Sequence, residues 1–253
     1  MRHSLRMFIL GFLIVPAALI LARPVQAGQV RVAVASNFFT TAQALALAFE
    51  RRGVHKVILS PGATGRHYAQ IVHGAPFDVF LAADAERPRK LEKAGLAIKG
   101  SRFTYAVGRL VLWSPRAGFV DGKGKILATE RFAHLALANP RLAPYGRAAK
   151  ETLQCLGLWK RLQPRLVQGE NAAQAFHFVT SGAAQLGFAA ASQIVSLKSG
   201  EKGSFWRVPR RCHGPILQQA VVLHDTAAAQ AFAAFLRNPA ARAIIKARGY
   251  DLP

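Results

Sequence analysis

Four short stretches of the sequence place small or hydroxyl-bearing residues where an apolar run gives way to a helical pattern. They are Ala35-Ser36-Asn37, the loop PGATGR around Thr64, Pro144-Tyr145-Gly146, and Asn171-Ala172. Glycine allows close approach of the backbone, and the start of a helix offers unpaired N–H groups at the positive end of its dipole. Such junctions favour an anion site built from hydroxyls and backbone amides, without a formal positive charge.

The hydroxyl at the first junction also has a simpler interpretation. Residues 30–35 are short and rich in valine, which indicates a buried strand, and the apolar residues of 38–49 are spaced like one face of a helix. Ser36 and Asn37 are therefore candidates for the N-cap of that helix. By the same reasoning Thr64 is a candidate for a hydroxyl that only stabilises a turn.

A periplasmic serine hydrolase is an alternative from another class, with Ser36 as nucleophile and one of the eight histidines as base. The sequence has no G-x-S-x-G stretch and no visible triad, so we expect that the protein is not an enzyme. Asp78 and Asp84 flank an apolar strand and are expected to act as caps or hinge contacts. Arg66 and His67, although next to the second junction, are expected to point to solvent. The histidines and cysteines lack metal-ligand spacing, so neither a metal site nor a cofactor is expected.

Short apolar runs alternate with helical patterns along the chain, which predicts an α/β fold with mostly parallel sheets covered on both faces. The predicted strands are 30–35, 56–60, 77–83, 108–115, 134–138, 165–167, 185–190, 205–209 and 216–223. The predicted helices are 38–49, 65–74, 85–95, 146–157, 172–182, 227–238 and 240–249. Ligands of open α/β sheets bind at the carboxyl ends of the strands, which is where the four junctions lie.

The first 27 residues have the features of a secretory signal peptide. Two arginines precede the apolar run MFILGFLIVPAALILA, and PVQA ends in a small-x-small cleavage pattern. An uncleaved membrane anchor is the alternative, but Pro16 interrupts the run, which is at the short end for a span. We therefore expect cleavage after Ala27 and export of the mature protein to the periplasm.

The charge and the two cysteines set further limits. Removal of residues 1–27 takes away three arginines and no acid, which lowers the formal net charge from +22 to +19. The basic residues are scattered singly or in pairs, so we interpret them as a solvated surface and expect no binding to nucleic acid. In an exported protein Cys155 and Cys212 can form one disulfide, although spacing alone does not establish it.

Several stretches together resemble the periplasmic molybdate-binding proteins that serve ABC importers. The resemblance covers nearly all of the mature chain and is carried by VAVASNF, PGATGRHYAQIVHGAPFDVFLAADAERP, ALANPRLAPYGRAAKETL, QGENAAQAFHFVTSGAAQLGFAAASQ and PILQQAVVL. It implies two α/β lobes joined by a hinge, with mixed, mostly parallel sheets and the ligand held between the lobes. Lobe 1 is expected at 28–108 and 222–253, and lobe 2 at 109–221.

The resemblance also implies a function and a set of ligand contacts. The protein is expected to capture molybdate or tungstate as a monomer and to deliver it to the membrane permease of an ABC importer. In such proteins hydroxyls and backbone amides hold a tetrahedral dianion. Ser36 and Thr64 match the hydroxyl positions, and Tyr145 and Ala172 match positions that use the backbone N–H.

The sequence departs from the family pattern at one position and leaves the ligand open. Some members have a tyrosine hydroxyl where this chain has Ala190, so that contact is absent or is replaced, with Ser192, another residue or water as candidates. A site of donors without acceptors favours a fully deprotonated dianion. Molybdate, tungstate and sulfate all meet this requirement, and sulfate or thiosulfate therefore remains an alternative ligand.

Overall fold

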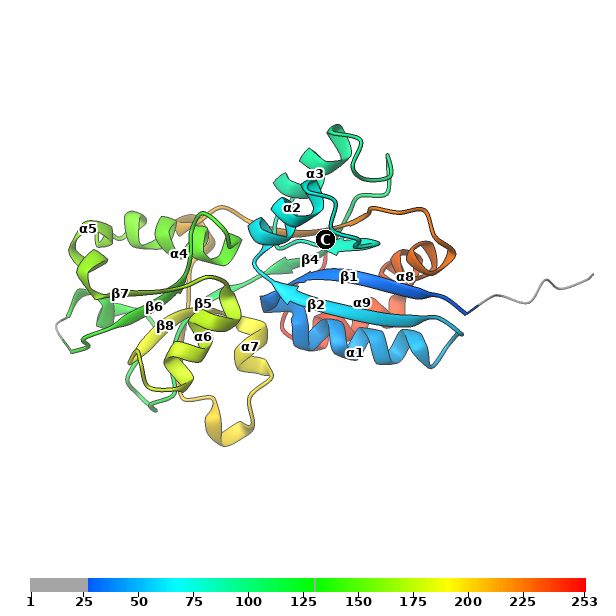
Figure 1. The fold of residues 1–253 in the computed structure, drawn as a ribbon. Helices are drawn as coiled ribbons and strands as arrows, with labels where there is room; N and C mark the ends of the chain where they lie inside the picture. Colours follow the sequence, from blue (N-terminus) through cyan, green and yellow to red (C-terminus); the bar gives the residue numbers. More distant parts are fainter. Residues whose placement is uncertain (1–26, 130) are drawn as a thin grey trace, which may run out of the picture.

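The computed structural model describes residues 27–129 and 131–253, so the predicted signal peptide lies outside the described residues apart from Ala27. Within these ranges the chain forms two five-stranded sheets that lie side by side in two lobes (Figure 1). None of the helices in the described part is long and apolar enough to cross a membrane.

The first lobe contains one of the sheets and both ends of the described chain. Its strands, in spatial order, are β2 (Lys56–Gly62), β1 (Gln29–Ala35), β3 (Val79–Leu81), β10 (Ile216–Val222) and β4 (Phe103–Gly108). Its helices are α1 (Phe39–Glu50), α2 (Thr64–Val72), α3 (Glu86–Lys93), α8 (Ala227–Arg237) and α9 (Pro239–Ala247). The first three strands are parallel, whereas β10 is antiparallel to both of its neighbours.

The second lobe repeats this arrangement. Its strands, in spatial order, are β7 (Leu166–Gly169), β6 (Leu135–Ala138), β8 (Leu186–Ala190), β5 (Leu110–Ser114) and β9 (Ser204–Arg207). Its α-helices are α4 (Pro144–Cys155), α5 (Trp159–Leu162), α6 (Ala172–Thr180) and α7 (Ala191–Val195). Short 3-10 helices complete the described chain: η1 (Ser36–Phe38), η2 (Lys125–Ala128), η3 (Gln163–Arg165), η4 (Ser199–Glu201) and η5 (Arg210–Cys212).

The inner strands of each sheet are buried on both faces because they are apolar at successive positions. In β1, Val32 and Val34 pack with α1, α8 and α9, whereas Ala33 packs on the opposite face with Ile71 of α2 and Leu91 of α3. Successive side chains of a strand point to opposite faces, so a continuous apolar run can fill two cores. The carboxyl end of β1 is thereby fixed between two helical layers, and the first junction follows it directly.

The predicted α/β fold with two lobes is confirmed, and the strand directions are mixed. Each sheet has two parallel and two antiparallel pairings within the described residues. The sequence does not indicate β4, which is the last strand before the chain passes into the second sheet. The chain rejoins the first sheet with β10 at Ile216, whereas the sequence places the return to lobe 1 at residue 222.

Two segments connect the lobes, one at Arg109 between β4 and β5 and one between β9 and β10. The carboxylate of Asp251 pairs with Arg109 on the first segment and with Arg210 on the second. The main chain of Asp251 exchanges two hydrogen bonds with Val107 at the end of β4. The C-terminal segment therefore ties both connections together at the hinge.

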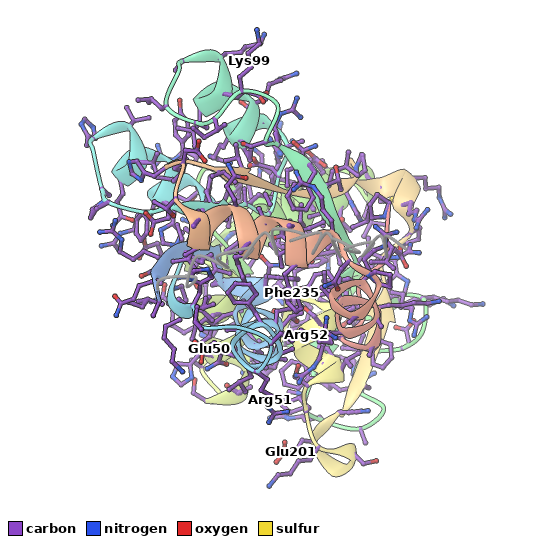
Figure 2. All side chains as sticks on the ribbon, turned by 90° about the vertical axis from the view of Figure 1, so that its right-hand side faces the viewer. Glu50, Arg51, Arg52, Lys99, Glu201 and Phe235 are labelled. Atoms are coloured by element: carbon purple, nitrogen blue, oxygen red, sulfur yellow. A yellow bond between two sulfur atoms is a disulfide. The ribbon has the colours of Figure 1, made fainter. Side chains whose placement is uncertain are left out.

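Charged side chains project from the periphery of the molecule (Figure 2). At the end of α1, Arg51 and Arg52 are both exposed, and the Arg52 guanidinium lies 5.7 Å from the centroid of the Phe235 ring. Lys99 and Glu201 lie at opposite extremes of this view. The arginines at this end of the first lobe are thus solvated, and one of them covers an aromatic ring.

The Asp78→Asn variant is expected to lose less stability than wild type as the pH falls. Burial alone would raise the pKa of the Asp78 carboxyl, but hydrogen bonds from the side chain and main chain of Arg31 outweigh burial and lower that pKa below its ordinary 3.8. A carboxyl with a depressed pKa stabilises the folded state above the unfolded-state pKa, and this stability is lost as pH falls through the folded-state value. Wild-type thermal midpoints should therefore approach those of the variant below about pH 4. Asp225→Asn is the control, and a constant gap between the wild-type and Asp78→Asn curves would contradict the prediction.

Candidate anion-binding site

Ser36 stands at the carboxyl end of β1 and reaches across to the second lobe. Its Oγ accepts a hydrogen bond of 3.2 Å from the backbone N–H of Ala173, in the first turn of α6. Neither Ser36 nor Asn37 caps the following helix, so the cap interpretation is wrong for both residues. The Asn37 side chain is buried instead and donates to Gln218 at 3.0 Å. Ser36 is the first residue of η1, and α1 begins only at Phe39, so Ser36 lies too early in the chain to cap α1.

Thr64 is the first residue of α2, and its side chain is buried. Its Oγ1 accepts a hydrogen bond of 3.1 Å from the N–H of Ala83, which follows β3. A hydroxyl has one proton to donate and two lone pairs to accept with. Among the hydrogen bonds of the described residues, Ser36 and Thr64 only accept, so each retains its proton for a further acceptor.

Tyr145 lies in the first turn of α4, where the helix leaves backbone N–H groups unpaired. Pro144 opens the helix and has no N–H, and Ala143 provides no side-chain cap. The amides of Tyr145 and Gly146 are therefore available for a ligand. A Cβ on Gly146 would collide with the carbonyl oxygen of Ala138, so only glycine allows this turn to pack against the end of β6.

Ala172 is the first residue of α6, as the fourth junction predicts. Asn171 caps this helix, because its Oδ1 accepts hydrogen bonds of 3.0 Å from the N–H groups of both Ala173 and Gln174. The N–H of Ala172 has no partner within residues 27–129 and 131–253. The cap thus satisfies the neighbouring amides and leaves the N–H of Ala172 available.

The four junctions meet at the boundary between the lobes. Ala35 and Ala83 of the first lobe pack in one buried cluster with Tyr145, Ala172 and Ala190 of the second. Ala35 precedes Ser36 in the chain, and the Ala83 amide binds Thr64. Residues at or directly beside all four junctions therefore belong to one buried cluster between the lobes.

Ala190 is hydrogen-bonded to Gln193 and not to Ser192. Ala190 is fully buried, and its N–H donates to the side chain of Gln193, which in turn donates to the Ala172 carbonyl at 3.2 Å. Ser192 is directed elsewhere, because its hydroxyl lies 2.8 Å from the Tyr250 hydroxyl and 3.3 Å from the Asn37 carbonyl. Gln193 therefore links the start of α6 to Ala190, the position at which some family members have a tyrosine.

Three buried tyrosines lie behind the junctions in a polar network centred on Gln218. Tyr105 and Tyr145 contact its side-chain amide, and Tyr250 joins the network through Asn37. Burial raises the pKa of Tyr250 to about 12, and it also raises the pKa values of Tyr105 and Tyr145 well above their ordinary value. All three rings therefore stay neutral at physiological pH.

Tyr145→Phe is expected to lower stability without changing anion affinity. The variant removes the hydroxyl that accepts from Gln218 at 3.4 Å, and loss of one buried hydrogen bond costs about 1 kcal/mol. The backbone N–H at this position is unchanged. Chemical unfolding and calorimetric titration measure the two quantities separately. An affinity loss larger than the stability loss would mean that the hydroxyl itself contacts the ligand.

Arg66 and His67, the two basic residues that follow Thr64 and Gly65, differ in exposure and in their contacts. Arg66 forms an exposed ion pair of 3.0 Å with Glu170 of the second lobe. The expectation that His67 points to solvent is wrong, because its ring is buried against Phe77 and Phe80. Burial lowers the pKa of His67, so the ring is neutral at physiological pH. In the described part of the chain, no group of three or more His, Cys, Asp or Glu side chains could hold a metal ion.

The two predicted carboxylates are not an acid pair. Asp78 binds Arg31, whereas Asp84 accepts the N–H of Arg87, in the first turn of α3, at 3.0 Å. Among the described residues, the hydrogen-bond partner of the Ser36 hydroxyl is the N–H of Ala173, and no histidine ring contacts it. What the four junctions provide is a set of hydrogen-bond donors.

The chain is similar to several known proteins. A family model described as bacterial extracellular solute-binding protein matches residues 30–251. The molybdate-binding protein ModA of Azotobacter vinelandii is 50% identical over 236 residues, which cover 92% of this chain and 94% of that protein. ModA of Rhodobacter capsulatus is 46% identical and covers 91% of each chain.

A solved structure matches almost as completely. The periplasmic molybdate-binding protein of Azotobacter vinelandii superimposes with a TM-score of 0.85 at 45% identity, covering 88% of this chain and 99% of that one. The resemblance identified from the sequence is thereby confirmed. Because the family model and both relatives span almost the whole described chain, the chain belongs to the bacterial extracellular solute-binding protein family.

Proposed function

We propose that this protein binds molybdate or tungstate between its lobes and delivers it to the membrane permease of an ABC importer. The hydroxyls of Ser36 and Thr64 and the backbone N–H groups of Tyr145 and Ala172 would hold the oxyanion. The observation that carries the proposal is the contact of Ser36 with Ala173, which leaves a hydroxyl proton of one lobe beside the free Ala172 amide of the other. The high identity to two ModA proteins supports the choice of ligand.

The chemistry of the donors favours a dianion without protons. Each of the four groups donates, and a protonated oxyanion such as hydrogen phosphate would need an acceptor for its O–H. Donors at helix starts also stabilise negative charge through the helix dipole. The site would thus bind molybdate through hydrogen bonds alone, without a metal ligand or a covalent step. Such binding is reversible, and a transport protein must be able to release its ligand.

Export and membrane delivery follow from the same proposal. The periplasmic relative of Azotobacter vinelandii and the signal-like first 27 residues support a mature protein in the periplasm. N-terminal sequencing of the exported protein should find Gly28 as its first residue. An intact N-terminus in the membrane fraction would contradict this part of the proposal.

The ligand is tested by calorimetric titration of the mature protein with molybdate, tungstate, sulfate, phosphate and thiosulfate. Molybdate and tungstate should compete for one site, and sulfate should bind at least about tenfold more weakly, because a smaller anion loses at least one hydrogen bond. Affinity for molybdate should be nearly constant across neutral pH, since hydroxyls and amides do not titrate there. Sulfate binding as tight as molybdate binding would overturn the choice of ligand.

A further inference from the structure

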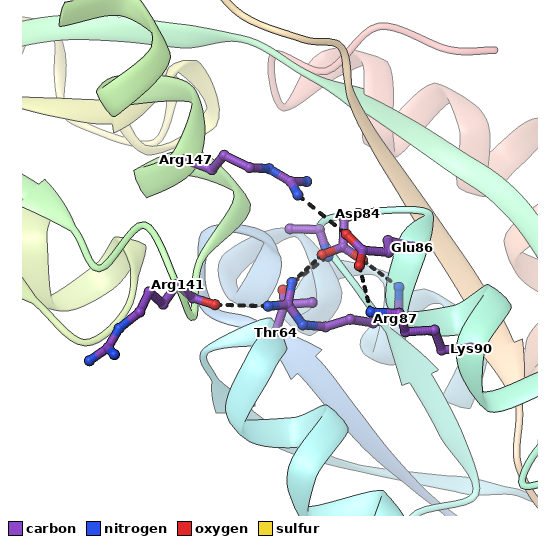
Figure 3. A network of polar contacts seen from close by, with 8 residues as sticks. Thr64, Asp84, Glu86, Arg87, Lys90, Arg141 and Arg147 are labelled. Carbon is purple, nitrogen blue, oxygen red and sulfur yellow. Dashed lines mark hydrogen bonds and ion pairs between the residues drawn. The ribbon is translucent and has the colours of Figure 1, made fainter. Parts of the chain in front are cut away.

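Arg87, on α3 of the first lobe, reaches a loop of the second lobe beside Thr64 (Figure 3). Its guanidinium pairs with the buried carboxylate of Asp84, and its Nη2 donates a hydrogen bond of 2.9 Å to the main-chain carbonyl of Arg141. The Arg141 side chain points away from this contact. Arg87 thus joins the two lobes through a backbone group that substitution of Arg141 would not remove.

A second contact between the lobes lies directly beside the first. The N–H of Gly65 donates to the Leu142 carbonyl at 2.8 Å, and a Cβ on Gly65 would lie 3.0 Å from both the Leu142 oxygen and the Arg87 Nη2. Consecutive carbonyls of the second lobe are therefore held by the first turn of α2 and by Arg87. Little room is left between these three groups.

The loop that they hold, residues 139–143, leads directly into α4. Asn139 organises this loop, because its side chain accepts from Arg141 and its carbonyl accepts from Leu142 and Ala143. Tyr145 follows only two residues after the loop ends. A force that fixes the loop against the first lobe therefore also fixes the position of the Tyr145 N–H.

We propose that Arg87 is a positioning residue that fastens the 139–143 loop to the first lobe in the closed protein and so slows release of the bound oxyanion. The inference rests on the proposed function, because it acts through the Tyr145 amide. The bond to the Arg141 carbonyl joins groups of different lobes, so opening of the lobes breaks it. Arg87 acts after capture of the ligand, on its release.

Arg87 is better suited to this role than the other cations that join the lobes. The Arg66–Glu170 and Arg147–Glu86 pairs have side chains that are 60%/37% and 47%/40% exposed, and such pairs contribute little. The Arg87 and Asp84 side chains are only 18% and 4% exposed. The planar guanidinium can bind a carboxylate and a carbonyl at once, and the pairing with Asp84 holds it in place.

The test is stopped-flow measurement of molybdate association and release for wild type, Arg87→Met, Asp84→Asn/Arg87→Met and the control Arg89→Met. Arg89 is exposed on the same helix. Release should be about tenfold faster in both Arg87 variants, with association unchanged, as loss of one charge-assisted hydrogen bond implies. Arg89→Met should match wild type. The double variant removes both charges, so it tests the contact without leaving Asp84 buried and unpaired.

Two results would overturn the proposal. Release at the wild-type rate in the double variant would mean that Arg87 only neutralises Asp84, and slower association with unchanged release would make it a steering charge. Titration of wild-type protein with molybdate comes first, because it tests the proposed ligand separately from the proposed role of Arg87. If wild type does not bind molybdate, the proposed ligand is wrong, and the same rates are then measured with the oxyanion that does bind.

Discussion

Replacement of both Cys155 and Cys212 by serine is expected to lower the free energy of unfolding by about 4 kcal/mol. The two cysteines form a disulfide that closes a loop with a sequence separation of 57. In the chain-entropy description a cross-link restricts the unfolded chain, and a loop of this length gives an effect of that size. Urea unfolding of the mature variant and wild type measures the difference.

The place of the disulfide adds a reason for the effect. Cys155 is the last residue of α4, whose first turn presents the Tyr145 amide, and Cys212 ends η5 on the second connection between the lobes. The bond therefore ties the helix of the site to the hinge. Wild-type protein unfolded in the presence of reductant is the control and should match the variant. A difference from oxidised wild type below about 1 kcal/mol would contradict the prediction.

Among the described elements, the sequence misses one strand, β4, and two short α-helices, α5 and α7. The case of β4 illustrates why. Pairing of β10 with β4 shifts register between Gln218 and Gln219, which is an irregularity of the β-bulge kind. Such a shift disturbs the alternation of buried and exposed residues that a sequence pattern depends on. By contrast, α8 and α9 begin and end within one or two residues of the predicted ranges, because their apolar faces are regular and Asn238 separates them.

The direction of a strand also cannot be predicted from the periodicity of its apolar residues. A buried strand has the same apolar pattern whether its neighbour is parallel or antiparallel. The antiparallel pairings of β10 and β5 arise where the chain crosses between lobes, which is a property of the whole fold. The βα units elsewhere give parallel pairs, as expected.

The junctions of the candidate site could be located from the sequence, but their contacts could not. Hydroxyls and glycines after apolar runs identify Ser36 and Thr64, because carboxyl ends of strands and starts of helices follow from local patterns. The partner of Ser36 lies 137 residues away in the other lobe. His67 is a basic residue in the first turn of α2, a place where basic side chains are usually exposed. Its burial follows only from packing against Phe77 and Phe80.

Ser36→Ala and Thr64→Ala are each expected to weaken molybdate binding by about 1–3 kcal/mol, or about five- to 150-fold in Kd, the range for a hydrogen bond to a charged group. Each variant also removes the acceptor of a backbone amide, from Ala173 in one case and Ala83 in the other. The Ser36 variant loses a contact between the lobes, so its effect should lie toward the upper end. Calorimetric titration of the mature protein measures the change.

Two matched variants separate loss of the hydroxyl from disturbance of the fold. Ser196→Ala removes an exposed hydroxyl on the rim of the same interface, where Oγ binds the Ser192 carbonyl at 2.9 Å, and its affinity should equal that of wild type. Thr64→Ser keeps the hydroxyl and should retain most of the affinity that Thr64→Ala loses. Unchanged molybdate affinity in Ser36→Ala would show that the serine at the end of β1 serves only to join the lobes, because the contact with Ala173 would then be its whole role.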